Sequence, residues 1–174
     1  GFGEVTLKHL LQMTSGIDYD ENDFPFGIHA RLYYTDRLED EILKFRLQEI
    51  PGTKFIYRSG DSFLLSLVLE RALGDRNITE YMQDRIWNPL GTEYNGAWNI
   101  DHAPDGLEKM GCCLAATARD FAKFGRLYLN KGNWDGRRIV SEAWIEASTR
   151  MDTSDESSWE YHYMWWLVAP DRPD

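Results

Sequence analysis

A short polar cluster contains a tyrosine and two serines, side chains that can transfer protons and attack carbonyl carbons. The cluster is YRSGDS, residues 57–62, and it lies between the turn PGT at 51–53 and an apolar run that ends at Gly74. A serine hydroxyl is a weak nucleophile until a base removes its proton. A tyrosine hydroxyl has a reference pKa of about 10, so it acts as a base at neutral pH only where cations lower that pKa. The cluster is therefore either part of an active site or the cap of a helix.

Tyr57 and Ser59 are the candidate catalytic residues of this cluster, and each also has a purely structural interpretation. Tyr57 could pack into a core, while Ser59 or Asp61 could cap the helix that follows. Arg58 points away from both of its neighbours if the segment is extended, so we expect it to form a structural ion pair.

The elements that must position the cluster are mainly helical. Capping residues and hydrophobic spacing predict helices from the Thr6 cap to Gln12, over 36–48 with Asp36 as the cap, from about 61 to 73, over roughly 78–87, from the Thr117 cap to about 130, and from the Ser141 cap to about 149. Residues 94–100 and 139–140 look extended, and YMWWLVA at 163–169 is a candidate for a buried strand. Strands and helices do not alternate, which argues against a doubly wound nucleotide-binding sheet.

An irregular segment at 17–34 is rich in aromatic and acidic residues. Loops of this length and chemistry tend to be functional or mobile. Tyr19, Glu21 and Asn22 are therefore candidate substrate contacts on a lid. The alternative is a solvated acidic loop without a binding role.

Composition limits the kinds of partner. The 174 residues suit one domain, and the net charge of -10 argues against nucleic acid, whose phosphates need a basic face. No apolar run has the length of a membrane span. No zinc-spaced or nucleotide-binding motif is present, so no metal or cofactor is expected. The two cysteines are adjacent, which disfavours a disulfide, and we interpret Cys112 and Cys113 as small buried thiols.

Four segments in order carry a resemblance to a known family. VTLKHLLQMTSGI, PGTKFIYRSGDSFLLSLVLERALG, RIWNPLG and GCCLAATARDFAKFGRLYLNKGNWDGRRIVSEAWIEAST resemble the conserved segments of the β-lactamase-related serine hydrolases, which include class C β-lactamases, DD-peptidases and esterases. The Tyr-Arg-Ser version of the second segment and the YDENDF loop look most like the branch with 6-aminohexanoate-oligomer hydrolases and carboxylesterases.

The resemblance implies a mechanism with three elements: a Ser-x-x-Lys nucleophile, a Tyr-x-Asn or Tyr-x-Ser motif, and a closing strand. In this chain Tyr57 would be the proton-transfer tyrosine, and Ser59 would stand where the family usually has asparagine. A serine there favours ester or simple amide substrates over β-lactams. Trp98, in a segment that resembles one near the family's pocket, would contact substrate or belong to the core.

No serine of this chain has a lysine three residues later, and the closing motif is also missing. We therefore expect residues 1–174 to be the middle part of a larger hydrolase: a mainly helical subdomain with a few short strands, taken from an α/β (α+β) β-lactamase-like fold. Missing sheet neighbours would leave apolar faces such as YMWWLVA uncovered, which predicts a chain that self-associates into a homo-oligomer, is partly disordered, or has been truncated.

Two other functions stay open from the sequence. The chain could belong to a family member that has lost catalysis and keeps its pocket as a sensor or binding module, or it could be a purely structural helical domain. A Ser-x-x-Lys in the preceding part of the parent protein would favour the enzyme, with a small-molecule ester or amide as substrate. The sequence does not decide between the bacterial cytoplasm and periplasm.

Overall fold

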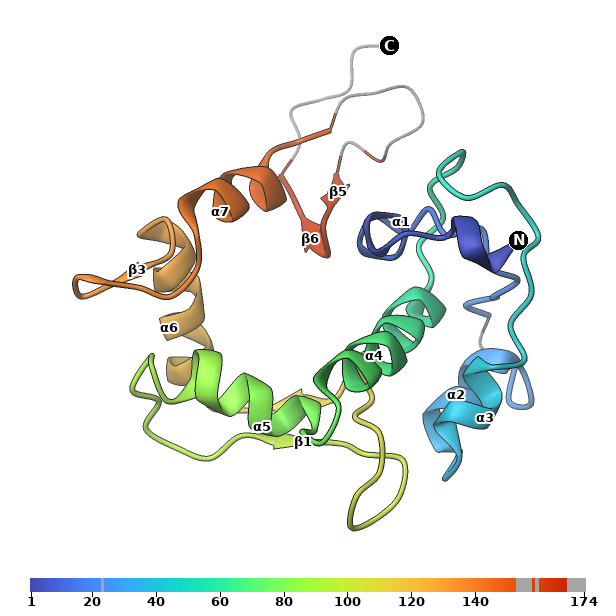
Figure 1. Ribbon diagram of the computed structural model, residues 1–174, viewed down its shortest axis with the longest axis horizontal. Helices are drawn as coiled ribbons and strands as arrows, with labels where there is room; N and C mark the ends of the chain where they lie inside the picture. Colours follow the sequence, from blue (N-terminus) through green and yellow to red (C-terminus); the bar gives the residue numbers. More distant parts are fainter. Residues whose placement is uncertain (23, 153–157, 159, 169–174) are drawn as a thin grey trace.

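The computed structural model describes residues 1–22, 24–152, 158 and 160–168, and these form a mainly helical body (Figure 1). The helical elements are η1 (Phe2–Glu4), α1 (Leu7–Leu11), α2 (Ile28–Tyr34), α3 (Leu38–Ile42), α4 (Ser59–Leu73), α5 (Ile78–Met82), the π-helical η2 (Gln83–Trp87), α6 (Ala118–Leu129) and α7 (Glu142–Thr149). Short antiparallel ribbons pair β1 (Ala97–Trp98) with β2 (Leu114–Ala115), β3 (Asn133–Trp134) with β4 (Arg137–Arg138), and β5 (Tyr161–His162) with β6 (Trp165–Trp166). The prediction of a helical body with a few short strands is confirmed.

Helix α4 lies at the centre of the core, with α1 beside its first turns and α5 beyond its last (Figure 1). Its buried residues Phe63 and Leu67 pack against apolar side chains of the first half of the chain and of α5. The helix ends at Gly74, which adopts a φ of 67° that only glycine reaches without strain. It begins at Ser59, two residues before the predicted start, and Arg58 occupies the N-cap position.

The predicted capping residues of three other helices are confirmed, and the structure adds a fourth cap that was not predicted. Thr6, Thr117 and Ser141 accept hydrogen bonds from the backbone N–H groups of the third helical residues, each at 3.2 Å. Asn77 does the same for α5 at 2.7 Å. Such contacts are set by neighbouring residues, which is why local sequence predicts them well.

The segment from 17 to 48 differs from its prediction in two ways. Helix α2 lies within the predicted loop, and the predicted helix over 36–48 is reduced to α3. Asp36 is not the cap, because the N–H of Leu38 donates instead to Asp101 Oδ2 at 2.7 Å. The segment after α3 leaves the helical path because Leu47 pairs with Ile17 in an isolated β-bridge.

The prediction of one buried strand over YMWWLVA is wrong. Tyr163 and Met164 have positive φ angles of 45° and 69° and form the turn between β5 and β6. Trp166 and Val168 are exposed, at 59% and 99%. The last residue of the predicted strand lies outside the described residues.

The prediction for the two cysteines is also wrong. Cys112 and Cys113 are joined by a disulfide, and both are half-buried. The backbone at Cys113 has a φ of 80°, so the chain turns sharply there and the two sulfur atoms can face each other.

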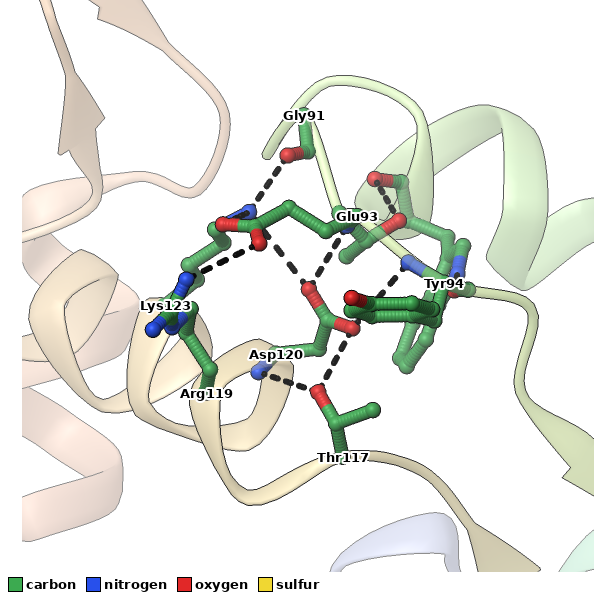
Figure 2. Close-up of polar contacts among 9 residues, drawn as sticks. Gly91, Glu93, Tyr94, Thr117, Arg119, Asp120 and Lys123 are labelled. Atoms are coloured by element: carbon green, nitrogen blue, oxygen red, sulfur yellow. Dashed lines mark hydrogen bonds and ion pairs between the residues drawn. The ribbon is translucent and has the colours of Figure 1, made fainter.

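Asp120 fixes the turn after η2 to the first turn of α6 (Figure 2). Its carboxylate accepts hydrogen bonds from the backbone N–H of Glu93 at 2.8 Å, the N–H of Tyr94 at 3.3 Å and the hydroxyl of Thr117 at 2.8 Å. Lys123 Nζ lies 3.4 Å from the same carboxylate. The Glu93 N–H and these other partners hold the pKa of Asp120 below its usual range. The aspartate side chain, only 1% exposed, therefore joins the fourth segment that carries the resemblance to the turn that follows the third, RIWNPLG.

Candidate active site

Tyr57 lies at the end of an extended segment that leads directly into α4. The segment is held in place by a hydrogen bond from the N–H of Ile56 to the carbonyl of Met13, at 3.0 Å. The Tyr57 side chain is 42% exposed, so its hydroxyl is not committed to the core. This placement favours the active-site interpretation of Tyr57 over the packing interpretation.

An aromatic wall, formed by Tyr161 and Trp166 of the β5–β6 hairpin, stands beside Tyr57. The Tyr57 ring meets Tyr161 edge to face at 5.7 Å and Trp166 at 5.4 Å between centroids. The two wall residues also contact each other at 5.0 Å. Burial raises the pKa of Tyr161, with the neighbouring Tyr57 and Asp61 contributing in the same direction. Tyr161 therefore stays protonated, and an apolar surface borders the exposed tyrosine.

Ser59 is the first residue of α4, and its backbone N–H donates to Glu21 Oε1. Its side chain is half-buried. Ser62, one turn further on, donates its hydroxyl to Met164 Sδ in the hairpin turn, at 3.9 Å. The cluster at 57–62 is thus in contact with both the 17–34 segment and the β5–β6 hairpin.

The structural role predicted for Arg58 is confirmed. Its guanidinium is 3% exposed and pairs with Glu49 at 3.3 Å between Nη2 and Oε2. The Arg58 side chain is directed into the protein, whereas that of Tyr57 reaches the surface.

Asp61 is the fully buried acid of the cluster. Burial raises its pKa to about 7, against the opposing effects of Ser15 and Arg58. Its Oδ1 accepts a hydrogen bond from the Ser15 hydroxyl, and its Oδ2 has no hydrogen-bond partner among the described residues. Ser15 belongs to the TSG of the first segment and Asp61 to the second, so this contact joins the two segments in the fold.

The buried acid predicts a pH dependence of stability. Between about pH 4 and about pH 7 the folded protein keeps a proton on Asp61 that the unfolded chain releases, so the free energy of unfolding falls as the pH rises, by at most about 1.4 kcal/mol per pH unit. Asp61→Asn should remove this part of the slope. Urea unfolding of the complete protein and the variant across that range measures it. Equal slopes in the two proteins would contradict the assignment.

The three candidates of the 17–34 segment occupy different places. Tyr19 is 6% exposed and belongs to the core, where its hydroxyl lies 2.7 Å from His29 Nδ1. Burial is the main cause that raises the pKa of Tyr19. Asn22 shapes the loop by accepting from the N–H of Phe24 at 3.0 Å. Only Glu21 touches the Tyr57–Ser59 segment, and it does so through the backbone of Ser59. The structure therefore places a core residue, a helix contact and a turn residue where we predicted three lid contacts.

Trp98 is far from Tyr57 along the length of α4. It packs against the core near the last turns of that helix, and its indole N–H donates to the carbonyl of Cys112 at 3.0 Å. Leu69, beside Trp98 at a common cavity, lies ten residues after Ser59, which corresponds to about 15 Å of helix. Trp98 is partly buried against the core and also lines cavities at this end of α4, so a substrate contact by Trp98 stays a prediction.

The position of the aromatic wall beside Tyr57 could not be predicted from the sequence. Tyr161 and Trp166 are separated from Tyr57 by about a hundred positions, and a run of apolar residues is compatible with a strand or a hairpin. The positive φ values of Tyr163 and Met164 involve residue types that rarely mark turns.

Within the described parts of the chain, no group of three or more histidine, cysteine, aspartate or glutamate residues could hold a metal ion. None of the helices described here is both long enough and apolar enough to span a membrane.

Comparisons with known proteins agree with this arrangement. A β-lactamase family model matches residues 1–173. The 6-aminohexanoate-dimer hydrolase of Paenarthrobacter ureafaciens is 28% identical over 129 residues, which cover 68% of this chain and 32% of that protein. A Bacillus anthracis structure provisionally named a 6-aminohexanoate-dimer hydrolase is 26% identical with a TM-score of 0.80, covering 98% of this chain and 49% of its own.

A penicillin-binding protein from Bacillus halodurans has the same fold, with a TM-score of 0.68 at 19% identity over 98% of this chain and 58% of that one. The chain thus spans about a third of the curated relative and about half of the first of these structures. Since the family model covers nearly every residue, the protein belongs to the β-lactamase family of hydrolases, and 6-aminohexanoate-dimer hydrolase is among its relatives.

Proposed function

We propose that residues 1–174 are the middle part of a serine hydrolase that cleaves ester or amide bonds through an acyl-enzyme. The observation that carries this proposal is the position of Tyr57, which is 42% exposed at the mouth of α4 in the segment that resembles the family's Tyr-x-Ser motif. In this mechanism the serine and the lysine of a Ser-x-x-Lys motif come from another part of the parent protein.

The proposed chemistry follows from the groups involved. The serine oxygen bonds to the substrate carbonyl carbon while Tyr57, as the phenolate, takes its proton. The lysine supplies the positive charge that favours this phenolate. The bond to the leaving alcohol or amine then breaks, and Tyr57 returns the proton to it. Water releases the acyl group in a second round of the same proton transfers.

The aromatic wall supports a linear, partly apolar acyl group as substrate. Trp166 offers an exposed indole, at 59%, next to Tyr57, and aromatic surfaces of this kind bind alkyl chains by burying them. A 6-aminohexanoate dimer, the substrate in the name of the Paenarthrobacter relative, consists of such chains joined by an amide. Ser59, whose hydroxyl can donate one hydrogen bond, would orient the substrate or the lysine.

A covalent probe tests the assignment of the nucleophile. A fluorophosphonate should label one serine of the complete protein, and mass spectrometry should place it outside residues 1–174, in a Ser-x-x-Lys motif. The 174-residue chain alone should neither react nor hydrolyse p-nitrophenyl butyrate. Labelling of Ser59 or Ser62, or turnover by the chain alone, would overturn the proposal. A complete protein without Ser-x-x-Lys and without labelling would favour the sensor or binding module instead.

A further inference from the structure

Helix α4 carries the Tyr57–Ser59 segment, yet its own residues do not cap it. Arg58 stands at the N-cap, and no side-chain hydrogen bond from it reaches the first turn. By contrast, α1, α5, α6 and α7 are each capped by the side chain of the preceding residue. The first N–H groups of a helix have no partner within the helix and carry partial positive charge. The start of α4 therefore needs an acceptor from elsewhere in the chain.

Glu21 supplies that acceptor from 38 residues earlier. Its Oε1 accepts the Ser59 N–H, and its Oε2 lies 3.2 Å from His29 Nδ1. The same nitrogen of His29 lies 2.7 Å from the hydroxyl of Tyr19. Side chains from two places in the 17–34 segment thus hold the Glu21 carboxylate on the first residue of α4.

Tyr19 completes the contact from the other side. Its ring lies against Gly60, where an added Cβ would come within 2.6 Å of Tyr19 Cδ2. Tyr19 itself is fixed by packing against Phe45, edge to face at 6.0 Å. We call the set of Tyr19, Glu21 and His29 against Ser59 and Gly60 the Glu21 clasp. Within it, Glu21 accepts the backbone N–H of Ser59, and the Tyr19 ring packs against the α-carbon of Gly60.

We infer that Glu21 is a positioning residue, which fixes the backbone of Ser59 and thereby the direction in which Tyr57 and the Ser59 hydroxyl face the substrate. This inference rests on the proposed function. Tyr57 lies two residues before Ser59 and has an exposed side chain, so a contact that fixes the Ser59 backbone limits the directions open to the Tyr57 side chain. Small displacements of a catalytic group reduce the rate strongly, because the reacting atoms must meet in a narrow range of geometry.

The test compares Glu21→Ala with Glu21→Gln in the complete protein. Alanine removes the acceptor and should lower kcat by about 10-fold while KM stays within about twofold, since the change affects orientation rather than binding. Glutamine keeps a carbonyl oxygen for the Ser59 N–H and should retain at least about half of kcat. Hydrogen–deuterium exchange of the peptide with residues 59–61 should accelerate in Glu21→Ala and less in Glu21→Gln.

Asn77→Ala is the matched control, because it removes the cap of α5, a helix that does not carry Tyr57. It should lower Tm to a similar extent and leave kcat unchanged. An equal loss of kcat in Asn77→Ala, or a Glu21→Gln as slow as Glu21→Ala, would overturn the positioning role. Unchanged exchange at 59–61 in Glu21→Ala would also overturn it. Tyr57→Phe distinguishes a failure of the proposed function from a failure of the positioning role. Wild-type kcat in Tyr57→Phe refutes the proposed function. A reduced kcat in Tyr57→Phe together with wild-type kcat in Glu21→Ala refutes only the positioning role of Glu21.

Discussion

Tyr57→Phe in the complete protein is expected to lower kcat for a p-nitrophenyl ester by about 100-fold or more, which is the usual contribution of a positioned acid–base group. The substitution removes one oxygen and keeps the ring, so the contacts with Tyr161 and Trp166 should survive. KM should change little if those aromatic contacts provide the binding energy. Steady-state kinetics together with Tm measure the two effects separately.

Tyr161→Phe is the control for this experiment. It removes a hydroxyl from the neighbouring ring, where that group donates to Met164 Sδ at 3.1 Å. We expect kcat within about threefold of the wild-type value, because no proton transfer is assigned to this group. If Tyr57→Phe is as active as Tyr161→Phe, Tyr57 has no part in the mechanism.

The second large effect is on stability. Asp120→Ala should lower the Tm of the complete protein by roughly 10 °C, since it leaves the N–H groups of Glu93 and Tyr94 and the hydroxyl of Thr117 without their acceptor. The pKa of Asp120 is held below its ordinary value of 3.8, so its contribution is present above about pH 4 and is lost as the pH falls further. The difference between wild type and variant should therefore shrink in acid.

Calorimetry at about pH 7 and about pH 3.5 gives both quantities. Glu93→Ala is the comparison, because it removes the ion pairs of the exposed Glu93 carboxylate to Arg119 and Lys123 and keeps the backbone N–H that Asp120 binds. Exposed pairs contribute little, and Tm should fall by no more than about 2 °C. A loss in Asp120→Ala as small as that in Glu93→Ala would show that Asp120 does not lock the turn to α6.

Local signals predicted much of the fold. Thr6, Thr117 and Ser141 were recognised as caps because each bond spans three residues, and Gly74 was recognised as a helix end because it follows an apolar run directly. The region from 17 to 48 was mispredicted because distant residues decide it. Asp101 starts α3 from 63 positions away. No pattern within 36–48 contains that information.

The candidate site was predictable only in its sequence-local part. Tyr57, Arg58 and Ser59 stand in one motif, and the prediction of a structural ion pair for Arg58 is confirmed. The partners of the motif come from elsewhere: Glu21 from 38 positions before Ser59, and Trp166 from a hairpin near the other end of the chain. Their contacts depend on how α1, α4 and the hairpin meet, which residue types alone do not specify.

The aromatic wall and the tyrosine are carried by different parts of the chain. The segment with Tyr57 is bonded to Met13, just after α1, and leads into α4, whereas the wall is carried by a hairpin with strands of two residues, whose Met164 N–H donates to the Leu11 carbonyl of α1 at 3.0 Å. If the proposed function holds, changes in the hairpin would alter the surface offered to the substrate while Tyr57 stays in place. A few substitutions at positions 161–166 would then exchange one preferred acyl group for another without a change in the proposed chemical step.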